Sequence, residues 1–202
     1  MSVPPNRDLL IVPANQAACE DLQTIFGSRG TGHVCQCQRY KLTPRESFGS
    51  VPREERAFRL REQTDCGNPD SDTTTGLVAY LDGEPVGWCA VEPRPAYVGL
   101  VRVFRVPWEG RDEDKQDESV WAVTCLFTRA GYRKQGISRT MARAAVDFAR
   151  SHGARALEAY PITTKNVIDE ELHVGTPATF LAAGLAEVSR PTKRRSVMRI
   201  DF

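Results

Sequence analysis

The chain has 202 residues, of which 41% are hydrophobic and 26% are charged, and this composition is typical of a globular protein. Its length fits one compact domain, so we expect residues 1–202 to form a single domain. Because 27 Lys and Arg residues oppose 26 Asp and Glu residues, the net charge of +1 gives no general attraction to nucleic acid, and we expect no such partner. The longest apolar run, 77–81, is far shorter than the roughly 20 residues that cross a bilayer, so no membrane partner is expected.

The N-terminus and the cysteines bear on location and on metal binding. The first residues lack the basic and apolar regions of a secretory signal, so we expect a cytoplasmic protein whose six cysteines are thiols. His33, Cys35 and Cys37 form the one cluster of metal-binding residue types, but a single residue separates the two cysteines and no second pair follows. This spacing does not match structural zinc, and no metal is expected. We predict instead a strand at 33–40 that buries both cysteines on one face, and any role beyond packing stays open.

Hydrophobic periodicity and the positions of Gly and Pro predict most of the secondary structure. In the first half we expect a strand at 9–12, helices at 16–26 and from residues 43 and 52, a loop at 67–75, and a hairpin of 76–81 with 85–91 around Asp82-Gly83-Glu84. Residues 97–106 either extend the hairpin or are irregular, and the acidic segment 109–118 is expected to be a solvated loop. In the second half we expect a central strand at 120–127, an amphipathic helix at 136–153, a strand at 156–160, a helix at 179–183, and strands at 186–188 and 196–200.

The loop between the central strand and the amphipathic helix has the features of an anion-binding site. The first N–H groups of a helix are unpaired, and the helix dipole adds partial positive charge at the same end. Gly136 lets an anion approach the backbone, and Ser138 can add a hydroxyl donor. Arg133 and Lys134 supply positive charge. The segment therefore predicts a site for a pyrophosphate group.

The same segment resembles the signature of the GNAT superfamily of acyl-CoA-dependent N-acetyltransferases, Gln/Arg-x-x-Gly-x-Gly/Ala. Arg133-Lys-Gln-Gly136-Ile-Ser138 matches this signature except for Ser in the last place. The chain is similar to a poorly characterised bacterial branch of that superfamily in which the fifth strand ends in Tyr-Pro, here Tyr160-Pro161. The resemblance implies an α/β (α+β) fold, in which helices flank a twisted mixed sheet. It covers about half of the chain, namely 76–91, 119–161 and, more weakly, 177–200, and leaves 28–75 and 92–118 as family-variable segments.

For function, the resemblance implies that an acetyl group moves from the cosubstrate acetyl-CoA to a primary amine, which attacks directly in a ternary complex. A backbone N–H of the central strand would steady the oxyanion. The resemblance implies that the pantetheine arm follows the end of the central strand, at Leu126, Phe127 and Thr128. It implies that the pyrophosphate lies on the loop and first turn of the helix, at Arg133, Lys134, Gln135, Gly136, Ile137, Ser138 and Arg139.

The catalytic acid and base stay open. Many relatives protonate the leaving thiolate with a tyrosine at the position that Phe180 occupies here, so Tyr160 could replace it or could simply pack its ring at the end of its strand. Glu118 before the central strand is a candidate base, although an ordinary surface carboxylate is the simpler interpretation. Glu158 and His173 could also titrate in the site, although an ion-paired or solvated role is the simpler interpretation of each.

The alternative function, the amine acceptor and the oligomeric state also stay open. Because Phe180 lacks a hydroxyl group, the alternative function is a non-catalytic acyl-CoA-binding regulatory module. The sequence defines neither the amine acceptor nor whether the chain forms a homodimer. Cys125, on the central strand, is expected to pack in the core because direct transfer needs no thiol nucleophile.

Overall fold

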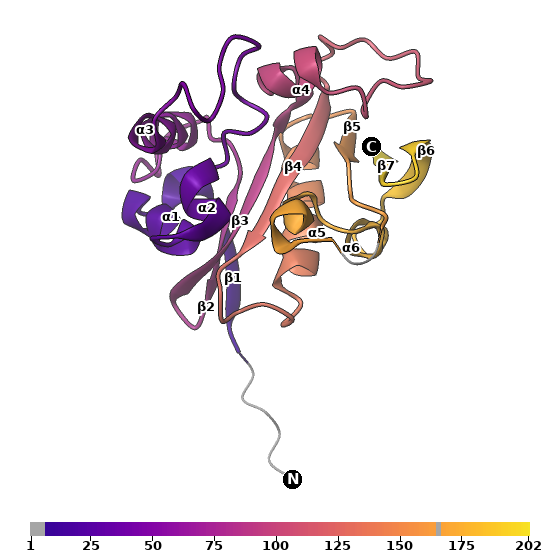
Figure 1. Cartoon of the computed structure of the whole chain (residues 1–202). Coiled ribbons are helices and arrows are strands. Elements are labelled where there is room, and N and C mark those ends of the chain that lie inside the picture. The colour runs from indigo at the N-terminus through magenta and orange to yellow at the C-terminus, as the bar shows by residue number, and fades with distance from the viewer. Residues whose placement is uncertain (1–6, 165–166) are drawn as a thin grey trace.

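The computed structural model describes residues 7–164 and 167–202, which form a seven-stranded sheet with helices on both faces (Figure 1). The strand order is β1-β2-β3-β4-β5-β7-β6. β4 (Val120–Thr128) and β5 (Ala156–Ala159) are parallel, whereas the other neighbouring strands of this sheet are antiparallel. The mixed sheet flanked by helices confirms the predicted fold class. No helix in the described part of the chain has the length and apolar character that crossing a membrane demands.

The N-terminal half contains three strands and four α-helices among the described residues. They are β1 (Leu9–Pro13), α1 (Cys19–Phe26), α2 (Gly30–Cys35), α3 (Arg53–Thr64), β2 (Leu77–Leu81), β3 (Glu84–Pro93) and α4 (Val98–Val103), with short 3₁₀ helices η1 (Ala14–Gln16) and η2 (Arg94–Ala96). The predicted hairpin is confirmed as β2 and β3, since Asp82 and Gly83 have φ of 53° and 83°, as a tight hairpin turn requires. Residues 43–46 form turns rather than the predicted helix, and 97–106 contain α4.

The C-terminal half follows the sequence prediction closely. After β4 come α5 (Ile137–Ser151), β5, η3 (Asp169–Val174), α6 (Pro177–Leu181), β6 (Ala186–Thr192) and β7 (Arg195–Asp201). α6 begins two residues before the predicted helix, because Pro177 occupies its first turn. The last two strands are longer than predicted and form an antiparallel hairpin at the edge of the sheet.

The strand predicted at residues 33–40 is wrong. The chain continues as α2 to Cys35, and Gln36 and Cys37 then adopt left-handed φ values of 48° and 57°. The buried side chains here are the amides: Gln36 Oε1 accepts from Gln23 of α1 at 3.0 Å, and Gln38 Nε2 donates to Gln63 of α3 at 2.9 Å. In the alternating sequence of this segment, the buried positions are therefore those of the glutamines, which have hydrogen-bond partners on α1 and α3. The two cysteines are only half-buried.

The expectation that all six cysteines are thiols is also wrong, because Cys19 and Cys66 form a disulfide. Cys19 is the first residue of α1, and Cys66 follows the end of α3. The Gly67 N–H donates to the carbonyl of Ala17 at 2.8 Å, which holds the two segments side by side. Nothing in the local sequence around either cysteine reports this proximity, since 47 residues separate them.

Two hydrophobic cores lie on opposite faces of the sheet. On the α5 face, α5 packs its apolar stripe of Ile137, Met141, Ala145 and Phe148 against strand residues that include Val123. On the α1 face, α1, α3 and α4 cover the sheet with core residues that include Leu22, Phe26, Leu60, Leu100 and Trp88. Figure 1 shows α1, α2 and α3 together on one side of the sheet.

The two parallel strands at the centre of the sheet separate part of the way along. β5 pairs with β4 only from Val120 to Val123, and β4 then continues to Thr128 paired with β3 but not with β5. No other strand in the described ranges pairs with this edge of β4 beyond that point. Just there β4 carries a bulge, because Val123 pairs with Val91 and Cys125 with Ala90, which leaves Thr124 without a partner. The separation leaves this edge of β4 without a strand partner beyond Val123 among the described residues.

Candidate active site

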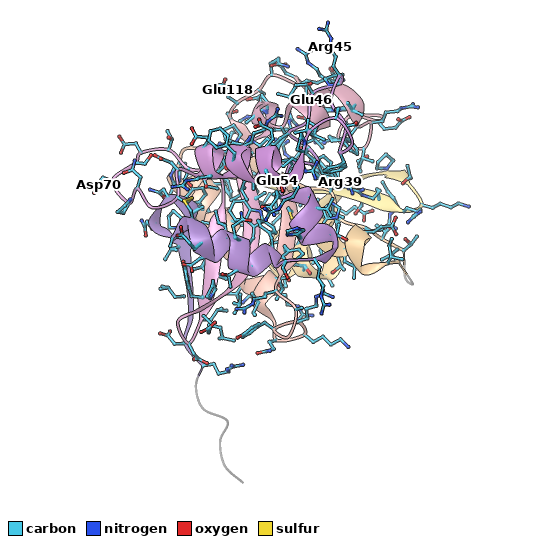
Figure 2. The ribbon with its side chains drawn as sticks, turned by 60° about the vertical axis from the view of Figure 1, so that its left-hand side comes forward. Arg39, Arg45, Glu46, Glu54, Asp70 and Glu118 are labelled. Carbon is cyan, nitrogen blue, oxygen red and sulfur yellow. A yellow bond between two sulfur atoms is a disulfide. The ribbon has the colours of Figure 1, made fainter. Side chains whose placement is uncertain are left out.

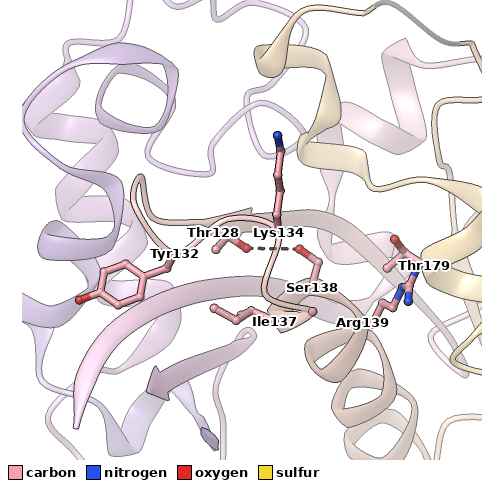
Figure 3. Close-up of a pocket in the computed structure, with 8 residues that line it drawn as sticks. Thr128, Tyr132, Lys134, Ile137, Ser138, Arg139 and Thr179 are labelled. Carbon is pink, nitrogen blue, oxygen red and sulfur yellow. Dashed lines mark hydrogen bonds between the residues drawn. The ribbon is translucent and has the colours of Figure 1, made fainter. Parts of the chain in front are cut away.

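A pocket of about 310 Å³ lies where β4 ends and α5 begins (Figure 3). It is bounded by the end of β4, by the connecting loop, by the first turn of α5 and by α6. The residues that line it are Thr128, Tyr132, Lys134, Gly136, Ile137, Ser138, Arg139 and Thr179. The pocket therefore occupies the segment in which the sequence predicted a pyrophosphate site.

The start of α5 is built to face an anion. Gly136 is the N-cap residue, with a φ of 83°, and no side-chain hydrogen bond caps the helix. A Cβ atom at Gly136 would meet no heavy atom within 4 Å, so the space in front of the first helical N–H groups is open. Unpaired N–H groups and the helix dipole favour negative charge at this place. Thr128 Oγ1 and Ser138 Oγ are 3.2 Å apart and join the strand to the helix across the pocket floor.

Six of the ten predicted cofactor residues line this pocket. They are Thr128, Lys134, Gly136, Ile137, Ser138 and Arg139. Leu126 is buried in the core of the α5 face, and Phe127 packs against Phe26 on the α1 face, with ring centroids 5.5 Å apart. Gln135 accepts a hydrogen bond from Arg7 at 2.7 Å, and neither it nor Arg133 lines the pocket. Lys134 and Arg139 therefore bring the positive charge at its rim.

Sequence reasoning missed two residues of the pocket. Tyr132 lies in the loop just before the signature and lines the pocket. The sequence did not indicate this, because an aromatic residue before two basic residues is not a recognised binding motif. Thr179 comes from α6 and accepts or donates a hydrogen bond with Thr176, also of the α6 segment, at 3.1 Å. Only the packing of α6 against α5 brings Thr179 to the pocket. No local signal could have found it.

Tyr160 follows the last residue of β5 and lies on the α1 face. Its hydroxyl is buried and donates a hydrogen bond to Glu158 Oε2 at 2.9 Å, and its backbone carbonyl accepts from Arg195 at 2.7 Å. Burial, together with the Glu158 charge, raises the pKa of Tyr160 well above its ordinary value. The hydroxyl therefore keeps its proton at neutral pH.

Glu158 is the centre of a buried ion-pair network. Its carboxylate lies 3.1 Å from Arg94, 2.5 Å from Arg111 and 2.8 Å from Arg199, and Glu113 completes the network. Burial acts to raise the pKa of Glu158, but the hydrogen bond from Arg111 and the charges of Arg111 and Arg94 hold it below its ordinary value. This is the ion-paired interpretation of Glu158. The network also includes Arg111 and Glu113 of the acidic segment 109–118, which was expected to be a solvated loop.

Glu118 is not brought together with the pocket. It is an exposed residue in the turn before β4, whereas the pocket lies at the other end of that strand. A strand of this length separates the two places by about 30 Å. Figure 2 shows the Glu118 side chain at the rim of the molecule.

Two further residues bear on the predicted chemistry. Phe180, for which the resemblance implied a tyrosine, is fully buried in the core of the α5 face. His173 lies in η3 with its ring 6.3 Å from the ring of Tyr40. In the described part of the chain, no group of three or more His, Cys, Asp or Glu residues is arranged to hold a metal ion.

Comparison with known families identifies the class of protein. The acetyltransferase (GNAT) family matches residues 38–173, which is more than half of the chain. The chain therefore belongs to the GNAT acetyltransferase family, and it is an acyltransferase. The matched region includes most of the segments that the sequence alone left unaligned. A search of curated proteins finds no match.

Solved structures of the same fold include an N-acetyltransferase from Staphylococcus aureus Mu50, which is 14% identical, with a TM-score of 0.53 and coverage of 96% of this chain and 98% of that one. A putative acetyltransferase from Salmonella typhimurium, solved with its cofactor acetyl-CoA, is 11% identical, with a TM-score of 0.54 and coverage of 96% and 93%. The PaiA N-acetyltransferase from Thermoplasma acidophilum, solved in complex with coenzyme A, is 12% identical, with a TM-score of 0.51 and coverage of 96% and 99%. At these identities the likeness shows the fold.

Proposed function

We propose that the protein moves an acetyl group from acetyl-CoA to a primary amine, and that the amine attacks directly in a ternary complex. The observation that carries this proposal is the pocket at the uncapped start of α5, beside the free edge of β4. Two structures of the same fold contain acetyl-CoA or coenzyme A, which supports the same cosubstrate here. Acetyl-CoA supplies the acetyl group as a reactive thioester.

The residues of the pocket fit such a cosubstrate. A pyrophosphate group needs N–H donors and positive charge, which the first turn of α5, Lys134 and Arg139 provide. The Ser138 hydroxyl is a further donor in the same place. An extended pantetheine arm needs backbone partners, and β4 offers an unpaired edge after Val123. We propose that these groups bind the cosubstrate and orient its thioester towards the bulge at Thr124.

The roles of acid and base belong to the proposal as well. Tyr160 is the proposed acid, since it stays protonated, although its hydroxyl already donates to Glu158. Replacing it in Tyr160→Phe removes only the hydroxyl group. If Tyr160 is the acid, kcat falls by about 10²-fold or more while KM for acetyl-CoA is unchanged. Glu118→Gln should leave kcat unchanged, because Glu118 lies at the end of β4 opposite the pocket. A fall in kcat as large as that expected for Tyr160→Phe would instead support Glu118 as the base.

Calorimetric titration with acetyl-CoA and with CoA tests the binding site. Gly136→Asp places a carboxylate at the start of α5, where it repels a pyrophosphate group, so the affinity should fall at least 10-fold. Gly153→Asp is the matched control, because Gly153 also has a positive φ, of 77°, also has open space around a Cβ atom, and lies just beyond the other end of α5. Equal loss in both variants, or no binding by the unaltered protein, would refute the proposed site.

The buried Phe180 keeps one alternative function under consideration, a non-catalytic acyl-CoA-binding regulatory module. This alternative predicts the same binding in calorimetry. Thiol release from acetyl-CoA, followed over a panel of primary amines, separates the two functions. Turnover with any amine of the panel supports the enzyme, and binding with no turnover across the panel supports the regulatory module.

A further inference from the structure

The loop of residues 129–136, between β4 and α5, has a backbone shape that needs support from outside. Three of its residues, Gly131, Lys134 and Gly136, have positive φ values of 90°, 63° and 83°. Lys134 carries a side chain, which makes this conformation unfavourable unless the surrounding structure holds it. Because the loop leads directly into the uncapped start of α5, its conformation also sets the direction of the first helical N–H groups.

The side chain of Gln135 holds this loop at two points. Its Nε2 donates across the loop to the carbonyl oxygen of Gly131 at 3.5 Å, and its Oε1 accepts a hydrogen bond from Arg7 Nη1 at 2.7 Å. Gln135 lies between Lys134 and Gly136, so fixing its side chain limits the rotation of both neighbours. Arg7, which is 128 positions away in the sequence, is therefore an outer support of the loop.

Arg7 is itself anchored to the turn between β2 and β3. Its Nε donates to Asp82 Oδ2 at 3.0 Å, and the other carboxylate oxygen, Oδ1, accepts from the backbone N–H of Asp8 at 3.0 Å. The Asp82 N–H in turn donates to the Asp8 carbonyl at 2.9 Å. The planar guanidinium thus joins two segments through two different nitrogen atoms. Figure 1 shows the start of β1, this turn and the loop before α5 at one end of the molecule.

We propose that Arg7 is a positioning residue of the cosubstrate site: by joining Asp82 to Gln135, it holds the loop of residues 129–136 in the conformation that binds the pyrophosphate group. This inference rests on the proposed function. Arg7 does not line the pocket, so it acts through Gln135 rather than on the cosubstrate. A loop that already has its binding conformation loses less freedom when the cosubstrate binds, which raises the affinity. Loss of Arg7 should therefore raise KM for acetyl-CoA and leave kcat unchanged.

Calorimetric titration of Arg7→Ala with acetyl-CoA tests the proposal. The dissociation constant should rise about 3-fold, an effect limited by the exposure of the Arg7 and Asp82 side chains, 48% and 47%. Arg155→Ala is the matched control, because the Arg155 side chain is also about half exposed, at 54%, and pairs with Asp117 at 2.6 Å, but before the other end of β4. An unchanged dissociation constant in Arg7→Ala, or an equal rise in both variants, would overturn the proposal.

Two further variants separate positioning from simple attraction between charges. Arg7→Lys keeps the positive charge but replaces two donors in one plane by a single ammonium group, so the affinity should fall as in Arg7→Ala. Asp82→Asn removes a negative charge near an anionic cosubstrate, which by charge alone would raise the affinity. Because it weakens the anchor of Arg7, and because Asn tolerates the φ of 53° at this position, the proposal predicts a fall instead. Full affinity in Arg7→Lys, or a rise in Asp82→Asn, would contradict the proposal.

Hydrogen exchange of the ligand-free protein tests the loop without any cosubstrate. The Tyr132 N–H donates to the Arg129 carbonyl at 3.1 Å, and the Arg139 N–H donates to the Gly136 carbonyl at 2.9 Å, so both amides report on the loop. Both should exchange about 3-fold faster in Arg7→Ala and at an unchanged rate in Arg155→Ala. Equal rates in all three proteins would refute the role of Arg7. Faster exchange in Arg7→Ala, when even the unaltered protein binds no acetyl-CoA, would support that role and count only against the proposed function.

Discussion

The two faces of the sheet are held by different kinds of interaction. The α5 face is an apolar core in which the amphipathic helix α5, together with α6, covers the strands. The α1 face contains buried charges as well as apolar side chains: Glu158 among three arginines, Glu92 with Lys41 at 2.5 Å, and Arg56, whose guanidinium donates to the carbonyls of Val34 and Phe48. Burial raises the pKa of Glu92 even beside its lysine. The spacing of apolar residues in the sequence therefore predicts the packing of the α5 face, but it predicts that of the α1 face only in part.

The largest expected effect comes from removing the central charge of the α1 face. Glu158→Gln leaves Arg94, Arg111 and Arg199 close together without their shared carboxylate, so the free energy of unfolding should fall by about 3 kcal/mol or more. Urea unfolding followed by circular dichroism measures the change. The matched control is Glu187→Gln on β6, which pairs with Arg190 at the surface and should cost less than about 1 kcal/mol. Similar losses in the two variants would mean that the buried network adds nothing to stability.

A smaller effect distinguishes how closely the two faces are packed. A Cβ atom at Gly99, in α4 on the α1 face, would lie 2.7 Å from the Leu42 carbonyl oxygen and 2.9 Å from that of Tyr40. A Cβ atom at Gly87, facing α5, would lie 2.9 Å from the sulfur of Met141. Backbone cannot move aside as the end of a methionine can, so Gly99→Ala should lower stability by about 2–3 kcal/mol and Gly87→Ala by about 1 kcal/mol. Thermal and urea unfolding of the two variants measure these losses. A larger loss in Gly87→Ala than in Gly99→Ala would show that α5 is packed more rigidly than α4.

The smallest expected effect depends on pH and concerns the turn before α3. Glu46 accepts hydrogen bonds from Arg59 and from the backbone N–H of Thr43, both at 2.9 Å, and these lower its pKa to about 2. A lowered carboxyl pKa adds stability above the unfolded-state value, near 4.5, and this stability is lost as pH falls towards 2. Because the pair is partly exposed, Glu46→Gln should cost less than about 1 kcal/mol at pH 7.

Unfolding of Glu46→Gln and of the unaltered protein, measured across pH, checks the direction of this pH dependence. The difference in unfolding free energy between Glu46→Gln and the unaltered protein should shrink between about pH 4.5 and pH 2. A difference that stays constant over that range would show that the glutamate acts through packing rather than through its charge.

How much the sequence could predict also divides along the two faces. β4, α5 and the hairpin were predicted because their patterns are local, and the place of the pocket, where we propose that the cosubstrate binds, follows from a strand, a glycine loop and a helix in direct succession. The sequence did not predict α2, the burial of Gln36 or the Cys19–Cys66 disulfide, because each depends on residues that are distant in the sequence. Thr179 reached the pocket in the same way, through the packing of one helix on another. Long-range pairing of polar groups leaves no periodic signal in one sequence.

The contact between Arg7 and the pocket loop has a practical consequence for labelling. Arg7 donates to Gln135 at 2.7 Å and to Asp82 at 3.0 Å, so the start of the described chain lies against the loop that precedes α5. At the other end of that helix, the guanidinium of Arg150 lies 4.7 Å above the ring of Phe202. An affinity tag or fluorophore joined after Phe202 therefore reports on the molecule from a distance. A label joined directly to Arg7 would instead lie against the loop that precedes α5, and it would respond to changes in that loop.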